Sequence, residues 1–580
     1  MDNMSSTCEA IPTTLKFPDG FMWGTATAAY QIEGGWNEGG RGMSIWDAFS
    51  KTPGKVVNGD TGDKAVDHFH LFKHDVQLMA NMGLKHYRFS ISWPRILPTG
   101  FADHVNEDGI AFYNALIDEL LAHDIEPIVT LYHWDLPLAL QTEYDGWLGG
   151  KIVVDAFATY ARLCFARFGD RVKSWLTLNE PWCSALLGHG TGEMAPGRKH
   201  KCKTETYLAA HNLLLAHAHA VQVYRTAFQS SQGGVIGITL NCDFREPKPS
   251  SDPAKFKQNQ EAAERALLVE LGWFADPVYF GDYPDVMKKQ LGTRLPRFTA
   301  DESKLLRGSS DFFGLNHYGT GYAAPSNAFR NKIVPGLDGV IWEDSGVDVT
   351  SNDKWLKTDM GWNAGGIVVT ENGCAVADVD RHAAEHDTFR VKFYEAYIAE
   401  MHKAITEHGV DVRGYFAWSF VDNYEWAFGY AKRFGLHWVD YTTMERVPKA
   451  SAKWFAQVIK HNRVDITEEN PIAVAAFEKD MQYHKEKLGD RKAFKSISHS
   501  LDFFDTNDHV AASRVYEWDE DCKKKPPERE EMMNPKERAV AHAATYKSWK
   551  PTHAGKEGES GWESVLGAED EETDVATGRL

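Results

Sequence analysis

The sequence predicts an α/β fold of the (β/α)8 TIM barrel class, in which eight parallel strands alternate with helical crossovers. Short β-type runs recur through residues 20–420, separated by long segments with helical periodicity, and eight such runs are present. In addition, a glutamate directly follows two of these runs, and glutamates at strand ends can take part in catalysis.

The predicted strands are short apolar stretches between more polar segments. In chain order they are Phe21–Thr27, Lys85–Ile91, Pro127–Tyr132, Ser174–Asn179, Val235–Asn241, Asp311–Tyr318, Gly366–Thr370 and Val412–Ser419. Six crossovers carry apolar residues at three- and four-residue spacing, and Pro or Gly stands at many of their ends. These predicted helical segments are Asp63–Met82, Glu107–His123, Lys151–Phe168, Thr204–Phe228, Pro253–Leu271 and Glu385–His408.

The connection from Tyr318 to Gly366 is different, because it is rich in Gly, Asn, Asp, Ser and Pro and contains no convincing amphipathic helix. We therefore predict that the helix between the sixth and seventh strands is missing. A parallel connection normally covers the sheet with a helix, so we expect part of the outer face of these two strands to be exposed.

The chain is predicted to have three parts: an N-terminal arm over residues 1–14, the barrel over residues 15–463, and a C-terminal extension over residues 464–580. Beyond about Val464 the charges are mixed and few apolar patterns are sustained. We expect this extension to be partly disordered or helical, with helical pieces near Pro471–Leu488 and Pro535–Ser548.

The composition excludes several classes of function. The 580 residues are 43% hydrophobic and 12% aromatic, enough for a large core, but the net charge of −19 and the lack of a long basic patch argue against nucleic acid as a partner. The sequence contains no apolar window as long as a membrane span and no leader pattern, so we expect a cytoplasmic protein that does not bind membranes. Its seven cysteines are scattered and are read as reduced thiols; we expect no metal and no cofactor.

Two strings carry the predicted chemistry, Thr177–Pro181 and Val369–Gly373, which place Glu180 and Glu371 at the ends of the fourth and seventh strands. A single glutamate at a strand end is usually a solvated loop residue. Two of them can converge, because the active sites of such barrels lie at the carboxyl ends of the strands. One carboxyl group that donates a proton and one that attacks a sugar carbon can together hydrolyse a glycosidic bond with retention of configuration.

Seven strings, from about Leu15 to Ile459, resemble glycoside hydrolase family 1 β-glucosidases, most closely the intracellular fungal and plant type. They are Phe21–Gly34, Tyr87–Trp93, Tyr132–Pro137, Thr177–Pro181, Gly314–Tyr318, Val369–Gly373 and Ala417–Ser419. The resemblance implies that Glu180 is the general acid/base and Glu371 the nucleophile. It also places Arg88 and Tyr318 beside Glu371, where a cation and a hydroxyl donor favour the ionised form.

The resemblance further implies a pocket that binds a sugar through hydrogen bonds and an aromatic floor. The implied substrate-binding residues are Gln31, His133, Trp134, Asn179, Asn316, Tyr318, Trp418, Glu425 and Trp426. A carboxylate at position 425 repels a phosphorylated sugar and so favours a neutral one. The leaving-group side stays open among Trp182, Leu187, His189, Asn241 and Tyr322.

The predicted function is a retaining β-glucosidase that acts on small β-glucosides such as cellobiose. Near Gly361 and Trp362, about twenty residues that the family carries are absent, a loss that would cost on the order of 5–10 kcal/mol. The alternative is therefore a catalytically impaired sugar-binding or interaction protein derived from the enzyme. A third hypothesis is that the C-terminal extension docks a protein partner; the sequence does not predict the oligomeric state.

Overall fold

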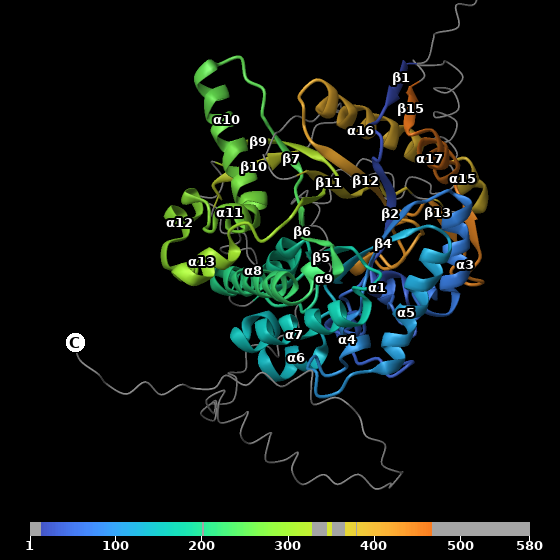
Figure 1. Cartoon of the computed structure of the whole chain (residues 1–580). Helices are drawn as coiled ribbons and strands as arrows, with labels where there is room; N and C mark the ends of the chain where they lie inside the picture. The colour runs from blue at the N-terminus through green and yellow to red at the C-terminus, as the bar shows by residue number, and fades with distance from the viewer. Residues whose placement is uncertain are drawn as a thin grey trace, which may run out of the picture. The chain divides into compact units, whose positions relative to one another are not determined.

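Eight parallel strands close into a barrel in the computed structural model of the chain, which describes residues 13–199, 202–326, 345–350, 366–376, 378 and 380–466 (Figure 1). The order around the barrel is β11-β12-β2-β3-β4-β5-β6-β8. All eight predicted barrel strands are confirmed. Their bounds are β2 Met22–Ala26, β3 His86–Ser90, β4 Glu126–Tyr132, β5 Ser174–Asn179, β6 Val235–Asn241, β8 Phe313–Asn316, β11 Ile367–Asn372 and β12 Val412–Trp418.

The six predicted crossover helices are also present. They are α3 His68–Asn81, α5 Glu107–Ala122, α7 Lys151–Phe168, α8 Cys202–Ala227, α10 Pro253–Leu267 and α16 Thr388–Thr406. The helix α10 shows why these segments begin where they do: Asp252 accepts the backbone N–H groups of Ala254 and Lys255, and Pro253 occupies the first helical turn. Barrel strands buried beneath such helices are apolar on both faces, as in β4, which is buried from Pro127 onward.

The remaining elements extend the loops and the two ends of the chain. The further helices are α1 Ala29–Ile32, α2 Ile45–Ser50, η1 Val57–Gly59, α4 Trp93–Ile96, α6 Leu138–Tyr144, η2 Gly146–Leu148, η3 Cys183–Thr191, α9 Gln229–Gln232, η4 Leu268–Gly272, α11 Trp273–Phe280, α12 Asp285–Leu291, η5 Gly292–Arg294, α13 Ala300–Leu306, α15 Arg381–Glu385, η6 Trp426–Phe428 and α17 Ala450–His461. The further strands are β1 Thr13–Lys16, β7 Phe244–Pro247, β9 Thr320–Pro325, β10 Val347–Thr350, β13 His437–Val439, β14 Arg446–Pro448 and β15 Arg463–Ile466.

The connection between β8 and β11 contributes two strands, β9 and β10, to a small three-stranded sheet that the sequence did not predict; the third strand, β7, follows β6. Strand β9 pairs with β7 in parallel and with β10 in antiparallel orientation. Figure 1 shows α10 beside this sheet. Three alanines of α10 pack against Ala323 and Val347 of the sheet, which makes a separate small core. The predicted missing helix falls on residues 327–344 and 351–365, which lie outside the described residues, as does the C-terminal extension beyond Ile466.

The two ends of the described chain meet. Strand β1 pairs antiparallel with β15, with Thr13 opposite Ile466 and Lys16 opposite Arg463. Figure 1 shows the two strands side by side, next to α17. Within the described part of the chain, every helix is too short or too polar to cross a bilayer.

Candidate active site

The two glutamates lie at the carboxyl end of the barrel and both are buried, with Glu180 7% and Glu371 3% exposed. Glu180 directly follows β5 with a φ of 43°, and its backbone N–H donates to the Thr239 carbonyl of β6 at 2.9 Å. Glu371 lies within β11, which extends two residues beyond the predicted end of that strand. The pairing with β8 shifts register between Val369 and Glu371. Irregularities of this kind change the direction of the side chain that follows them, which here is Glu371.

Glu371 is held by a cation and a phenol. Its Oε1 accepts a hydrogen bond from Arg88 Nη1 at 2.5 Å, and its Oε2 accepts one from the Tyr318 hydroxyl at 2.7 Å. Burial raises the pKa of Glu371, and Arg88 and Tyr318 oppose that rise. The ion pair is almost fully buried on both sides, so water screens it little.

Glu180 has neutral partners instead. Its Oε1 accepts a hydrogen bond from Asn316 Nδ2 at 2.6 Å, and its Oε2 accepts one from the Cys183 thiol at 3.1 Å. Burial and the charge of Glu371 raise the pKa of Glu180 to about 8. Because only Glu371 touches a cation, Glu371 is the carboxyl that stays ionised and Glu180 is the one that keeps a proton near neutral pH.

One amide network connects the two carboxyl groups. Asn179 Oδ1 accepts hydrogen bonds from Arg88 Nη2 at 2.6 Å and from Asn316 Nδ2 at 3.1 Å. These two bonds fix the orientation of the Asn179 amide, whose Nδ2 then donates to His133 Nε2 at 3.0 Å. His133 must therefore carry its proton on Nδ1, an atom that is buried and has no partner among the described residues.

The two glutamates line one pocket. Ten of its lining residues were predicted from the sequence: His133, Trp134, Asn179, Glu180, Asn316, Tyr318, Glu371, Trp418, Glu425 and Trp426. Arg88 and Gln31 are buried but do not line the pocket; each touches a residue that does. Gln31 Nε2 donates to Asn423 Oδ1 at 3.1 Å and to the Tyr424 carbonyl at 3.0 Å, with a longer contact of 3.4 Å to Glu425 Oε2.

Aromatic rings form the wall next to Glu425. The His133 ring lies nearly parallel to those of Trp418 and Trp426, with centroid distances of 5.9 and 5.8 Å. Trp134 has a φ of 75° and donates from its indole nitrogen to the Asn179 carbonyl at 2.9 Å. Burial lowers the pKa of His133 well below its usual range, so the imidazole is neutral.

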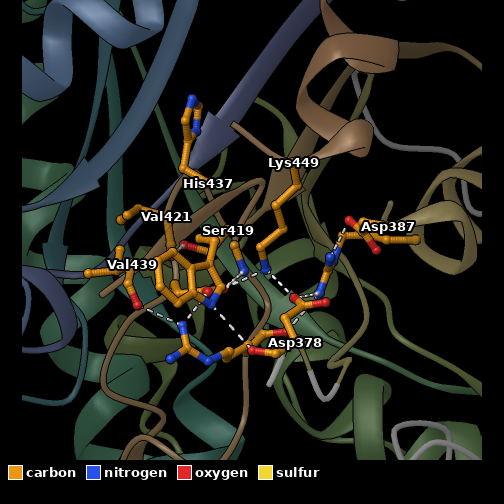
Figure 2. A network of polar contacts seen from close by, with 12 residues as sticks. Asp378, Asp387, Ser419, Val421, His437, Val439 and Lys449 are labelled. Atoms are coloured by element: carbon orange, nitrogen blue, oxygen red, sulfur yellow. Dashed lines mark hydrogen bonds and ion pairs between the residues drawn. The ribbon is translucent and has the colours of Figure 1, made fainter. Parts of the chain in front are cut away.

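A buried ion network holds the loop that carries Glu425 (Figure 2). Lys449 Nζ lies between two aspartates, at 2.8 Å from Asp422 and in contact with Asp378. Asp378 also pairs with Arg390 at 3.1 Å, which joins the loop after β11 to helix α16. The network therefore ties together the segments that follow strands β11 and β12, close in sequence to Glu371 and Glu425.

Four further residues line the pocket that were not predicted as site residues: Asp243, Glu270, Phe434 and Cys183. Of the five candidates for the leaving-group side, only Asn241 lines the pocket. The sequence contained one usable signal for Glu270, because it is the only charged residue within the apolar stretch Ala266–Ala275. Among the described residues, no group of three His, Cys, Asp or Glu side chains is placed to hold a metal ion.

The comparisons with known proteins point to one family. The model for "Glycosyl hydrolase family 1" matches residues 13–464. Beta-glucosidase 42 of Arabidopsis thaliana is 48% identical over 469 residues, which are 77% of this chain and 94% of that protein. Beta-glucosidase 1B of Phanerodontia chrysosporium is 46% identical over 473 residues, which are 76% of this chain and 85% of that protein.

Solved structures give the same result. A variant of the rice β-glucosidase Os3BGlu6, in a covalent complex with glucose, has a TM-score of 0.71 and 44% identity and covers 76% of this chain and 98% of its own. A β-glucosidase of that family from the fungus Humicola insolens, in complex with glucose, has a TM-score of 0.71 and 41% identity. The match covers 77% of this chain and 98% of the Humicola insolens chain.

Proposed function

The chain belongs to glycosyl hydrolase family 1 and is a glycoside hydrolase, and on that premise we propose that it is a retaining β-glucosidase. It removes terminal non-reducing β-D-glucosyl residues from small glucosides such as cellobiose. The observation that carries this proposal is the division between the two carboxyl groups of one pocket: Glu371 touches Arg88 and Tyr318, whereas Glu180 touches only neutral groups.

The first half-reaction forms a covalent glycosyl-enzyme. Glu371 attacks the anomeric carbon while Glu180 gives its proton to the leaving-group oxygen. The attack consumes the negative charge that raised the pKa of Glu180. Glu180, now without its proton, therefore stays ionised and acts as general base: it takes a proton from the incoming water, whose oxygen bonds the anomeric carbon as the bond to Glu371 breaks. The rice relative trapped in a covalent complex with glucose supports this sequence of steps.

Unsatisfied polar atoms on the Glu425 side support binding of a neutral sugar. His133 lines the pocket and has a buried Nδ1–H without a partner among the described residues, so a sugar hydroxyl that accepts from it would satisfy this donor. Gln31 Oε1, beside Glu425, is also buried without such a partner. Burial and the charges of Glu371 and Glu180 raise the pKa of Glu425 to about 8. The Trp418 ring offers an apolar face for the carbons of the sugar.

The alternative of an impaired sugar-binding protein is not favoured. Glu371 bonds to Arg88 and Glu180 bonds to Asn316. The β-glucosidases of Arabidopsis thaliana and rice described above match this chain over most of their length. Cys164, Cys183, Cys242 and Cys374 are free thiols, which supports our proposal of a cytoplasmic enzyme.

The test is hydrolysis of 4-nitrophenyl β-glucoside and cellobiose by the purified full-length protein, with the anomer first released identified by NMR. We expect turnover with β-glucose as the first product. Glu371→Gln should lower kcat by a factor of about 10³ or more while the folded state is kept, because the amide is a poor nucleophile of the same shape. Wild-type protein that binds glucose but turns over neither substrate would instead support the sugar-binding alternative.

A further inference from the structure

The pocket has a second polar wall, which the proposed catalytic roles do not use. Asn241, Asp243 and Glu270 all line the pocket, and we refer to these three residues as the acidic wall. Each is buried, and Glu270 is only 2% exposed. Glu270 lies in η4, a π-helical segment between α10 and α11, and such segments are frequent at functional sites.

Arg245 holds the Glu270 carboxylate by one oxygen only. Glu270 Oε2 accepts hydrogen bonds from Arg245 Nε at 3.1 Å and from Nη2 at 2.8 Å. Among the described residues, the other oxygen, Oε1, accepts one hydrogen bond, from the backbone N–H of Asp243 at 3.4 Å. A carboxylate oxygen can accept two hydrogen bonds, so Oε1 keeps acceptor capacity. Burial raises the pKa of Glu270 to about 7, and both its ionised and its protonated form can hydrogen-bond a hydroxyl group.

The rest of the wall also has free hydrogen-bonding capacity. Asp243 Oδ1 accepts the backbone N–H groups of Gly319 at 2.9 Å and Tyr318 at 3.4 Å. Within the described part of the chain, Asp243 Oδ2 and the side-chain amide of Asn241 make no hydrogen bond. The wall therefore presents several acceptors and one amide donor that no described protein group satisfies.

The barrel topology places this wall across the site from the sugar-binding residues. Asn241 ends β6, and β6 lies four strands from β2 in either direction around the barrel. Gln31, which follows β2, contacts Glu425. A glucosyl ring held near Glu425 therefore directs its leaving group toward β6, past Glu180, which follows the neighbouring strand β5.

We propose that Asn241, Asp243 and Glu270 bind the leaving group and select a hydroxyl-rich, saccharide leaving group over an aryl or alkyl one. This inference rests on the proposed β-glucosidase function. An apolar leaving group would cover these polar atoms without replacing the hydrogen bonds that water makes to them, whereas a sugar supplies hydroxyl groups to each. A site built to bond hydroxyls discriminates strongly against analogues that lack them.

The test compares kcat/KM for glucose disaccharides with kcat/KM for 4-nitrophenyl β-glucoside, using cellobiose, laminaribiose and gentiobiose to cover three linkages. Both values report the same attack by Glu371, so their ratio isolates the leaving group. The double variant Arg245→Met/Glu270→Met removes the ion pair without leaving a buried charge unpaired. We expect it to lower the ratio for the best disaccharide at least about tenfold.

Two further variants make the result decisive. Glu270→Gln keeps the shape of the side chain and should lower the same ratio about threefold, which tests the inference even when the double variant does not fold. Asp276→Asn, in helix α11, changes an acid that does not line the pocket, and we expect it to keep the ratio within about twofold.

The outcomes separate the two proposals. An unchanged ratio in folded variants overturns the acidic wall as a leaving-group site but leaves the β-glucosidase intact. An equal fall for both substrate classes also overturns it, since that result indicates that Glu270 supports the catalytic residues and not the leaving group. Wild-type protein that hydrolyses none of these substrates overturns the proposed function and, with it, this inference.

Discussion

Glu180 and Glu371 carry the same group, and their neighbours give them different chemistry. Glu371 donates electrons as an anion, so the Arg88 guanidinium and the Tyr318 hydroxyl stabilise the form that reacts. Glu180 must deliver a proton, and its contacts with Asn316 and Cys183 bring no positive charge. The ordering of the two pKa values thus follows from a few contacts around each carboxyl group.

This ordering predicts a bell-shaped pH profile of kcat/KM. Activity needs Glu371 ionised and Glu180 protonated, so it falls on the acid side as Glu371 takes up a proton and on the alkaline side as pH rises through about 8. Tyr318→Phe removes a hydrogen bond that favours ionised Glu371. We expect the acid limb to move to higher pH by roughly half a unit to one unit.

The measurement is kcat/KM for 4-nitrophenyl β-glucoside over the pH range in which the protein stays folded. Tyr279→Phe is the control, because Tyr279 bonds the Phe312 carbonyl and does not line the pocket. An acid limb that stays in place in Tyr318→Phe would show that the phenol does not tune Glu371.

Removing the acid should affect substrates according to their leaving group. Glu180→Gln leaves no proton donor, so kcat/KM for cellobiose should fall by about 10²–10⁴. A 2,4-dinitrophenyl β-glucoside releases a stable anion without protonation, and its kcat/KM should fall by less than about tenfold. Steady-state kinetics on both substrates checks this; an equal loss on both would assign Glu180 a role other than proton donation.

At the scale of elements, the carboxyl ends of β11 and β12 depend on the buried ion network of Figure 2. Lys449 precedes α17 and contacts Asp378 and Asp422, and all three side chains are inaccessible to solvent. Arg433 adds a contact to Asp422 at 2.7 Å. The network therefore joins three parts of the chain: the segment after β11, the segment after β12 and the residue before α17.

Lys449→Met should destabilise the fold, because it leaves two buried aspartates without one of their cations. We expect a loss of about 3–5 kcal/mol in the free energy of unfolding, measured by urea denaturation. Lys453→Met changes an exposed lysine of the same helix, and the expected change is within about 0.5 kcal/mol. Equal stability of the two variants would contradict a structural role for the network.

The whole barrel was predictable because its signals are local. Each strand is a short apolar run, and six crossovers have helical periodicity, so their order alone specifies the topology. The catalytic residues were predictable because their strings are contiguous and lie at strand ends. Glu371 nevertheless lies inside β11, not after it, because pairing with β8 and β12 extends the strand to Asn372.

The sequence could not predict contacts that depend on packing between distant segments. Glu270 reaches the pocket from a π-helical turn, where the register of side chains departs from the α-helical period that sequence patterns reveal. The small sheet of β7, β9 and β10 forms from segments that read as loop, and its pairing is not local. The resemblance implied that Gln31 binds the sugar, and this role stays a prediction; the sequence did not reveal that its amide donates to the Tyr424 carbonyl and lies 3.4 Å from Glu425 Oε2.

At the scale of the molecule, the residues from β1 to β15 contain all the parts that the proposed reaction uses. The pocket is lined by residues 133–434, and the family match covers residues 13–464. A chain that ends after Ile466 keeps the β1–β15 pair and should retain kcat/KM within about twofold and its unfolding free energy within about 0.5 kcal/mol. Such a result would mean that the barrel needs no residue after Ile466 for its activity or its stability.

A chain that ends after Asn462 is the matched comparison. It lacks β15, and with it the buried Val464 and the backbone pairing with Thr13–Lys16, so the free energy of unfolding should fall by about 2 kcal/mol or more. Urea denaturation and 4-nitrophenyl β-glucoside turnover on both truncated chains measure the two effects. Because no residue of β15 lines the pocket, activity per folded molecule should stay the same. A loss of activity in the shorter chain alone would mean that the terminal strand pair helps to hold the catalytic end of the barrel.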